Sequence, residues 1–228
     1  MQTGHHRPIR SFVLRQGRLT SAQEHALTHY WENYGIDLPE HALNGAELFG
    51  NTAPVTLEIG FGNGESLLQM ARNQPEHNFI GIEVHAPGVG HLLSRIHELQ
   101  LANLKVMHTD AVEVLKKHLA PASLQRILIY FPDPWHKKRH NKRRLIQPEL
   151  VSLLGNLLEP GGLLHLATDW EDYALHMAGV MQASPLFRSL APDGTAFSPR
   201  PDFRPLTKFE QRGLRLGHGV RDLLYQRL

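Results

Sequence analysis

Cysteine is absent from this 228-residue chain, which excludes a disulfide framework, a thiolate zinc site and a cysteine nucleophile. The chain also lacks any apolar run near the ~18 residues that a membrane-spanning helix needs. Its first residues, MQTGHHRPIRSF, do not contain the apolar core of a secretory signal peptide. Together these absences predict a cytoplasmic protein that does not enter a membrane.

Positive charge is scarce except in one place. The formal net charge is only +2, yet residues 136–144 (HKKRHNKRR) contain six Lys or Arg and no acid. The rest of the chain then holds 18 basic and 22 acidic residues, a formal charge of −4. A charge that served solubility would be spread out, so this block predicts a localised contact with a polyanion. A solvated loop is the alternative.

Strands and helices alternate from Val55 onward. Expected strands cover residues 55–60, 78–84, 104–110, 124–131 and 159–169, and expected helices cover 64–73, 88–100, 111–119, 148–158 and 170–182. This order predicts an α/β fold, with a mostly parallel sheet covered by helices on both faces. Residues 220–228 read as a last strand. Residues 194–213 are long and irregular, which favours a functional segment.

The first part of the chain reads as an extension. We divide the chain into an N-terminal extension, residues 1–53, and a main domain, residues 54–228. Residues 21–35 indicate a helix, with Ser21 as a possible N-cap and Glu24 three residues later, as in a capping box.

A carboxylate stands at or near the end of each of the five expected strands. Open parallel sheets bind ligands beyond these carboxyl ends, and five desolvated acids would repel one another without a partner. The acids are Glu58, Glu83, Asp110, Asp133 and Asp169. The first strand also runs into a glycine turn made by Gly60, Gly62 and Gly64.

Two cofactors are compatible with the glycine turn. A dinucleotide would place its pyrophosphate at the start of the following helix, but Glu65 occupies the position of the third fingerprint glycine and would oppose that charge. S-adenosylmethionine carries no phosphate, and its ribose diol suits a carboxylate such as Glu83. Asp110 could accept from the adenine amino group. The residues therefore favour S-adenosylmethionine.

Several motifs resemble those of the bacterial tRNA (guanine-N(7)-)-methyltransferase family. They are EIGFGNGE, GIEVH, FPDPWHKKRHNKRR, TDWEDYA and RPLTKFEQRG, and the resemblance covers almost the whole chain. It implies a class I, Rossmann-like methyltransferase with an antiparallel last strand. It also implies S-adenosylmethionine as the methyl donor, and the guanine at position 46 in the tRNA variable loop as the acceptor.

The resemblance also implies roles for individual residues. Cofactor contacts fall on Glu58, Glu83, Asp110 and Asp133, beside the glycine turn. Substrate contacts fall on Lys137, Asp169, Thr207, Lys208, Phe209 and Glu210. For two of these sites a second reading stays open: Asp169 could simply cap a helix that begins at Trp170, and residues 207–210 could be a helix start with no further role.

The sequence around Asp133 suits methylation of a ring nitrogen. Guanine N7 carries a free lone pair, so it needs no general base before it attacks a methyl group. Asp133, between Pro132 and Pro134, could instead accept from the guanine N–H groups and orient the base. The basic block would then hold RNA phosphates through Arg139, His140, Asn141, Lys142, Arg143 and Arg144.

Some alternatives remain. Trp135 is as compatible with core packing as with stacking, and the cations around His136 and His140 make a metal site there improbable. A methyltransferase for a small molecule or another RNA, and a nucleotide-binding oxidoreductase, are competing functions. The sequence does not determine the oligomeric state, and we favour a monomer.

Overall fold

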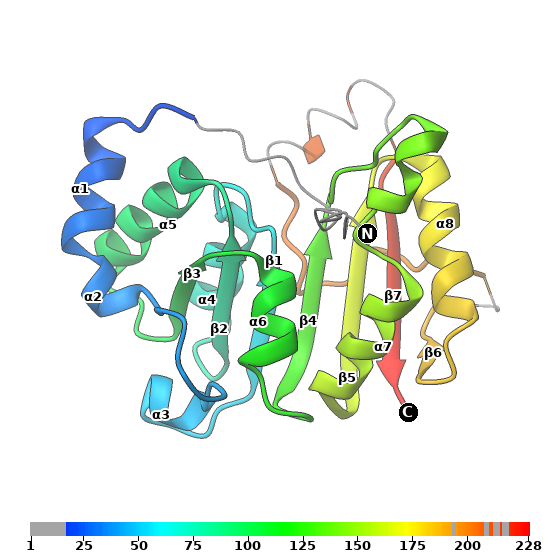
Figure 1. The fold of residues 1–228 in the computed structure, drawn as a ribbon, viewed down its shortest axis with the longest axis horizontal. Coiled ribbons are helices and arrows are strands. Elements are labelled where there is room, and N and C mark those ends of the chain that lie inside the picture. The colour runs from blue at the N-terminus through cyan, green and yellow to red at the C-terminus, as the bar shows by residue number, and fades with distance from the viewer. Residues whose placement is uncertain (1–16, 193–194, 208–209, 212–214, 216–218) are drawn as a thin grey trace, which may run out of the picture.

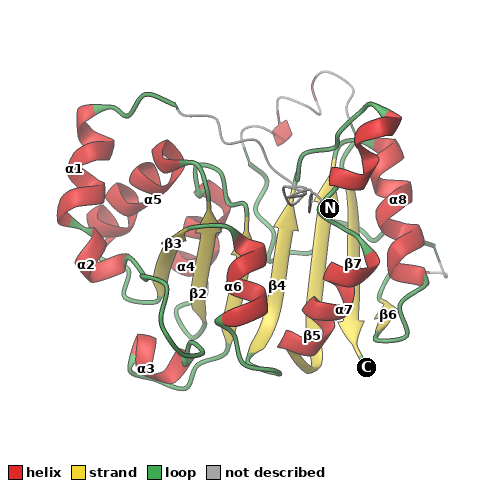
Figure 2. Cartoon of the chain, viewed as in Figure 1, coloured by secondary structure: helices red, strands yellow, loops and turns green. Residues whose placement is uncertain are grey.

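A computed structural model describes residues 17–192, 195–207, 210–211, 215 and 219–228 of the chain. Seven strands form one sheet in the order β3-β2-β1-β4-β5-β7-β6, and only β7 runs antiparallel to the other strands (Figures 1 and 2). The strands are β1 (Val55–Ile59), β2 (Asn78–Glu83), β3 (Leu104–His108), β4 (Leu124–Tyr130), β5 (Leu158–Thr168), β6 (Phe187–Ser189) and β7 (Arg221–Arg227). The strand order reverses between β1 and β4, so a ligand site is expected at that point.

Helices cover both faces of the sheet, as predicted. They are α1 (Ser21–His29), α2 (Trp31–Tyr34), α3 (Gly45–Phe49), α4 (Glu65–Asn73), α5 (Ala86–Leu99), α6 (Ala111–Lys117), α7 (Pro148–Leu157) and α8 (Glu171–Gln182), with a 3₁₀ helix, η1 (Lys138–Arg143). All five predicted strand–helix pairs are confirmed, and the last strand, β7, is antiparallel. Helix α3, η1 and the three-residue strand β6 were not predicted from the sequence.

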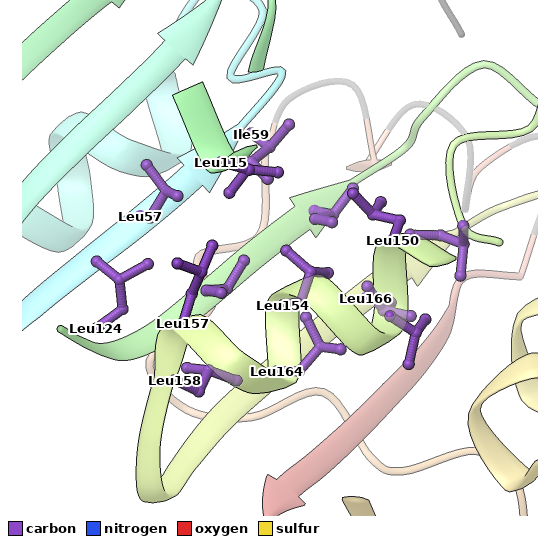
Figure 3. Packing of buried hydrophobic residues seen from close by; sticks show 14 of the residues in the cluster. Leu57, Ile59, Leu115, Leu124, Leu150, Leu154, Leu157, Leu158, Leu164 and Leu166 are labelled. Atoms are coloured by element: carbon purple, nitrogen blue, oxygen red, sulfur yellow. The ribbon is translucent and has the colours of Figure 1, made fainter. Parts of the chain in front are cut away.

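One core layer lies between the sheet and helices α6, α7 and α8. Leu57 and Ile59 alternate onto this face of β1, and Leu154 and Leu157 of α7 belong to the same buried cluster (Figure 3). All four side chains are buried. Burying one leucine side chain stabilises a fold by roughly 1.5–3 kcal/mol, so this layer is a main source of stability.

The second core layer lies on the other face and includes part of the N-terminal extension. Leu67 of α4 and Leu92 of α5 are fully buried there, and Ala26 of α1 joins them. Helix α1 begins after a capping box formed by Thr20 and Gln23, so the prediction of Ser21 as N-cap was wrong by one residue.

No helix among the described residues covers β4, β5 and β7 on this second face. Phe203 packs instead among the buried residues there, with Leu128 and Tyr130 of β4. In Figure 1 the orange trace of the C-terminal segment passes behind these strands. The irregular C-terminal segment therefore takes the place of a covering helix. Within the described ranges, no helix is long and apolar enough to cross a membrane.

Candidate active site

A cavity of about 500 Å³ opens at the carboxyl ends of β1, β2, β3 and β4, beside the reversal in strand order. This is where an open parallel sheet is expected to bind its ligand. The cavity brings together most of the predicted cofactor residues. Its lining comprises Ile59, Gly60, Gly62, Ile82, Glu83, Val84, His85, Thr109, Asp110, Ala111, Val112, Tyr130, Phe131, Pro132, Asp133 and Leu145.

The glycine turn needs glycine for two different reasons. Gly60, Gly62 and Gly64 all have positive φ, at 74°, 60° and 75°. A Cβ on Gly60 or Gly62 would meet no atom within 4 Å, so these two positions leave the cavity open to a close ligand. A Cβ on Gly64 would lie 2.7 Å from Leu92, and one on Gly88 would lie 2.1 Å from the Gly62 carbonyl oxygen. Those two glycines instead let α5 pack against the turn.

Glu83 lines the cavity and holds the glycine turn in place. Its Oε2 accepts a hydrogen bond from the Gly62 N–H at 2.8 Å. Its Oε1 accepts from Val84 N–H at 2.7 Å and His85 N–H at 2.9 Å. Three backbone N–H groups thus fix the orientation of this carboxylate. Glu83 thus builds the site as well as facing it, and its contact with a ribose stays a prediction.

Asp110 also combines a structural task with a place in the cavity wall. Its Oδ1 accepts from Val112 N–H at 2.9 Å, which makes it the N-cap of α6. Its contact with an adenine stays a prediction.

Glu58 differs from the other strand-end acids. It lies within β1, its side chain is only 3% exposed, and it is not part of the cavity lining. Within the described structure its Oε2 has no hydrogen-bond partner. Burial, with a smaller effect of the Glu83 charge, raises the pKa of Glu58 to about 8. The raised pKa favours the neutral form of Glu58, and in that form it does not repel the nearby Glu83.

The Pro-Asp-Pro turn after β4 is bracketed by two strained residues. Phe131 and Trp135 adopt positive φ values of 49° and 48°, which non-glycine residues rarely do. Strain of this kind costs on the order of 1–3 kcal/mol per residue and persists only where the surroundings impose it. The result is that Asp133 lies exposed at the rim of the cavity. Asp133 therefore lies at the mouth of the cavity and is not enclosed by Pro132 and Pro134.

The basic block, residues 136–144, is exposed only in part. Lys137 precedes η1 and is exposed, as are Lys138, Arg139 and Lys142. The Arg143 guanidinium lies 3.8 Å from the centroid of the Trp135 ring, within the range of a cation–π contact. His140 and Asn141 are half-buried. Loss of hydration, followed by the charges of the surrounding cations, lowers the pKa of the His140 imidazole.

Arg144 corrects the prediction for this block. Its side chain is 3% exposed. The guanidinium donates to the Pro134 carbonyl oxygen at 3.0 Å and binds Asp172 at the start of α8. Its role is to fix the Pro-Asp-Pro turn against α8, and its buried position does not offer it to RNA.

Asp169 and Trp170 lie between β5 and α8. The N-cap of α8 is Trp170, whose N–H donates to Thr168 Oγ1 at 3.2 Å, so the interpretation of Asp169 as a helix cap was wrong. Contact between Asp169 and substrate stays a prediction.

The two histidines of the basic block contact different aromatic rings. The centroid of the His136 ring lies 4.1 Å from that of Trp170, whereas His140 stacks on Trp135. The two histidines therefore serve different aromatic contacts. No group of three or more possible metal ligands occurs in the described ranges.

Of the four residues predicted at 207–210, the structure describes Thr207 and Glu210. Thr207 Oγ1 accepts from Glu210 N–H at 3.2 Å, which caps the turn between them. The Glu210 carboxylate is buried against Arg204 and is not part of the cavity lining, and its contact with substrate stays a prediction. Lys208 and Phe209 lie outside the described residues.

Sequence reasoning missed a buried polar cluster behind the cavity. It joins Tyr130, His165, Asp222, Arg204 and Glu210. A signal was present, because His165 interrupts the apolar run LLHLA of β5 and Asp222 precedes the apolar part of β7.

The strand order and the cavity at the carboxyl ends of the strands are those of the class I methyltransferase fold. A solved structure titled as the 16S rRNA methyltransferase KamB aligns with a TM-score of 0.54, covering 79% of this chain and 91% of that one at 14% identity. At that identity the likeness concerns the fold alone. A 30S ribosomal A1408 methyltransferase from an uncultured bacterium aligns similarly, with a TM-score of 0.53, 15% identity, and coverage of 86% and 98%.

Sequence comparison narrows the class to a family. Residues 52–223 match a family model described as putative methyltransferase. A tRNA (guanine-N(7)-)-methyltransferase of Shewanella amazonensis is 54% identical over 97% of this chain and 93% of its own length. Its counterpart in Escherichia coli strain UTI89 is 55% identical, with coverage of 97% and 92%. The chain therefore belongs to the tRNA (guanine-N(7)-)-methyltransferase family.

Proposed function

We propose that this chain transfers a methyl group from S-adenosylmethionine to N7 of the guanine at position 46 in the variable loop of tRNA. The observation that carries the proposal is the continuity between the cavity and the exposed cations. Asp133 lines the cavity mouth, and Lys137, Lys138 and Arg139 follow it directly on the surface. A base entering the cavity would bring its phosphates to these cations. The names of these relatives support tRNA as the substrate, and the loop position rests on the motif resemblance.

The residues of the cavity fit S-adenosylmethionine. Gly60 and Gly62 leave open space on the cavity side, and Glu83 and Asp110 supply carboxylates at the adjacent strand ends. When bound, this cofactor supplies an electrophilic methyl group on a positively charged sulfur. A dinucleotide fits less well, because Glu65 opens α4 at the position where a pyrophosphate would bind. Glu83 would orient the ribose and Asp110 the adenine.

Asp133 would position the guanine. An ionised carboxylate accepts hydrogen bonds only, so it can take the ring N–H and amino group of guanine and stabilise the cation that methylation of N7 creates. No proton has to leave N7, which explains why the site needs no general base. Lys137 would contact the nucleotide beside the pocket, and the cations of η1 would neutralise neighbouring phosphates.

Nucleoside mass spectrometry tests the proposed function. Purified enzyme is incubated with S-adenosylmethionine and an unmodified tRNA, or with the same tRNA carrying adenine at position 46. We expect 7-methylguanosine from the first tRNA and none from the second. Equal methylation of both would exclude the loop position, and no product from either would exclude the reaction.

The role of Asp133 is tested in single-turnover experiments. Asp133→Asn keeps the shape but adds a donor, so we expect methyl transfer to slow by about 100-fold or more, as for other residues that stabilise transition-state charge. Binding of tRNA and of S-adenosylmethionine should change little. A near wild-type rate would make the exposed carboxylate dispensable.

A further inference from the structure

One of the three tryptophans of the chain, Trp170, is exposed just beyond the carboxyl end of β5. It is 40% exposed, whereas Trp31 and Trp135 are half-buried. The indole N–H of Trp31 donates to Asp37 at 2.9 Å, and the ring of Trp135 meets the Arg143 guanidinium. Aromatic side chains contribute much of the energy of interfaces, so an exposed indole at the ligand end of the sheet points to a surface that a substrate covers.

The start of α8 uses the backbone of Trp170 and not its indole. Trp170 is the N-cap of the helix, and its N–H donates to Thr168 Oγ1 at 3.2 Å. The N-cap makes no side-chain hydrogen bond to the helix. A smaller residue could therefore begin α8 equally well, and helix capping does not explain a tryptophan at this position.

The indole contacts the turn that carries Asp133. The centroids of the Trp170 and His136 rings lie 4.1 Å apart, and the ring planes are inclined by 66°. The two rings are therefore not stacked, and His136 can cover at most one face of the indole. His136 follows Asp133 by three residues, and Asp133 lies at the mouth of the cavity.

Arg144 fixes the indole and the carboxylate relative to each other. Its buried guanidinium donates to the Pro134 carbonyl oxygen at 3.0 Å and also binds Asp172. Pro134 directly follows Asp133, and Asp172 lies two residues beyond Trp170. One cation thus joins the two segments, so the position of the exposed ring beside the cavity mouth is set in advance of binding.

The charges around the ring favour a base over a phosphate as its ligand. Glu171 and Asp172 directly follow Trp170, and their side chains are 71% and 69% exposed. These acids would repel a phosphate placed on the ring, whereas a base carries no charge. Exposed cations stand on the other side, because Lys137 and Lys138 follow His136 in the turn. A nucleotide could place its base on the indole and its phosphate at these cations.

We propose that Trp170 is a stacking surface for the base next to the target guanine. Trp170 is not part of the cavity lining, so the guanine would enter the cavity while its neighbour rests on the indole outside. Stacking on aromatic side chains is a common way in which proteins hold unpaired RNA bases. The inference rests on the proposed function and deepens it, because it assigns a second nucleotide of the RNA substrate to a place on the enzyme.

Removal of single bases from the RNA tests this contact. Filter binding compares an intact tRNA with two tRNAs that lack the base on the 5′ or on the 3′ side of the target guanine. We expect wild type to bind one of the two abasic tRNAs on the order of tenfold more weakly, as for the loss of one stacked base. Trp170→Ala should bind the intact tRNA with the same loss, and removal of that base should cost this variant nothing further.

Variants of the ring separate stacking from other effects. Trp170→Phe keeps an aromatic face and should retain most of the affinity, whereas Trp170→Leu keeps apolar volume only and should behave like Trp170→Ala. None of the three should change the salt dependence of binding, because no phosphate contact is lost. Leu175→Ala, at a 59% exposed apolar residue of the same helix, is the matched control and should bind as wild type does.

Three results would overturn the assignment. The first is wild type that binds all three tRNAs equally well, a comparison that needs no variant and therefore no test of folding. The second is Trp170→Ala that still loses affinity when the neighbouring base is removed. The third is a shallower salt dependence in Trp170→Ala, which would mean that the ring acts through the neighbouring cations.

Binding and methylation are measured on the same tRNAs, which separates this inference from the proposed function. Wild type that does not methylate the intact tRNA would refute the proposed function. Wild type that methylates it but is indifferent to both neighbouring bases would refute only the stacking role of Trp170.

Discussion

The turn after β4 and the segment after Phe203 are both rich in arginine, yet cations are mostly exposed in the first, whereas Arg204 is buried in ion pairs in the second. In the turn, Lys138 and Arg139 are exposed to solvent, and the sequence of residues 136–144 contains no acidic residue. In the segment, Arg204 is enclosed by Glu210 and Asp222. An exposed cation stays available to a phosphate, whereas a buried one must be neutralised within the protein. The comparison separates charges that can bind a substrate from charges that hold the fold.

The largest expected effect follows from breaking the buried cluster at Asp222. Asp222→Ala removes a partner from Arg204 and from His165 at once. Breaking a buried ion pair on one side costs about 3–5 kcal/mol. Urea unfolding should show this loss, and Asp133→Ala, at an exposed carboxylate, should change the unfolding free energy little. Equal effects of the two variants would remove the distinction between the regions.

Glu58 extends the comparison, because it is buried and none of the described cations forms an ion pair with it. Its folded pKa of about 8 exceeds the usual 4.5, so its contribution to stability is complete below pH 4.5 and is lost as pH rises through 8. Glu58→Gln does not titrate. At about 1.4 kcal/mol per pKa unit, the variant should gain a few kcal/mol over wild type between pH 5 and pH 9. Unfolding across that range measures it, and a difference independent of pH would contradict the shifted pKa.

A smaller effect is expected at Arg144, the buried member of the basic block. Arg144→Ala leaves the Pro134 carbonyl without its donor, which costs about 1–3 kcal/mol. For a chain of this size that lowers Tm by about 2–4 °C per kcal/mol. The exposed neighbour serves as control, since Arg139→Ala should leave Tm unchanged. The prediction is contradicted if Arg144→Ala keeps its stability but binds tRNA more weakly in a salt-dependent way. Arg144 would then be an RNA-contacting residue.

The smallest effect concerns salt. The double variant Lys138→Ala/Arg139→Ala should make the log–log dependence of tRNA affinity on salt shallower by about 0.7–0.9 for each phosphate that the protein no longer neutralises. The matched control is Lys116→Ala/Lys117→Ala, a pair of cations in the last turn of α6. Filter binding over a salt series measures both slopes. If the two double variants have the same slope, the basic turn is only a solvated loop.

The hydrophobic pattern within single elements was sufficient to predict the layered α/β fold. The apolar runs of β1 and β4 and the helical periodicity of α4 and α5 persist over whole elements, so period and length identify them. The glycine turn and the strand-end carboxylates were also readable, because parallel strands bring their carboxyl ends to one edge. That is why Glu83, Asp110 and Asp133 were correctly expected near one another.

Partners distant in the chain were decided only by the tertiary structure. Arg139 and Arg144 look alike in the sequence, but Arg144 meets Asp172 on another element and is buried. Glu210 looks like a surface acid, yet its pairing with Arg204, which also binds Asp222, draws it into the protein. The physical reason is that a charged side chain can be buried only where its counter-charge arrives from elsewhere. Period and composition report burial of apolar faces, whereas the pairing of charges depends on which segments the fold brings together.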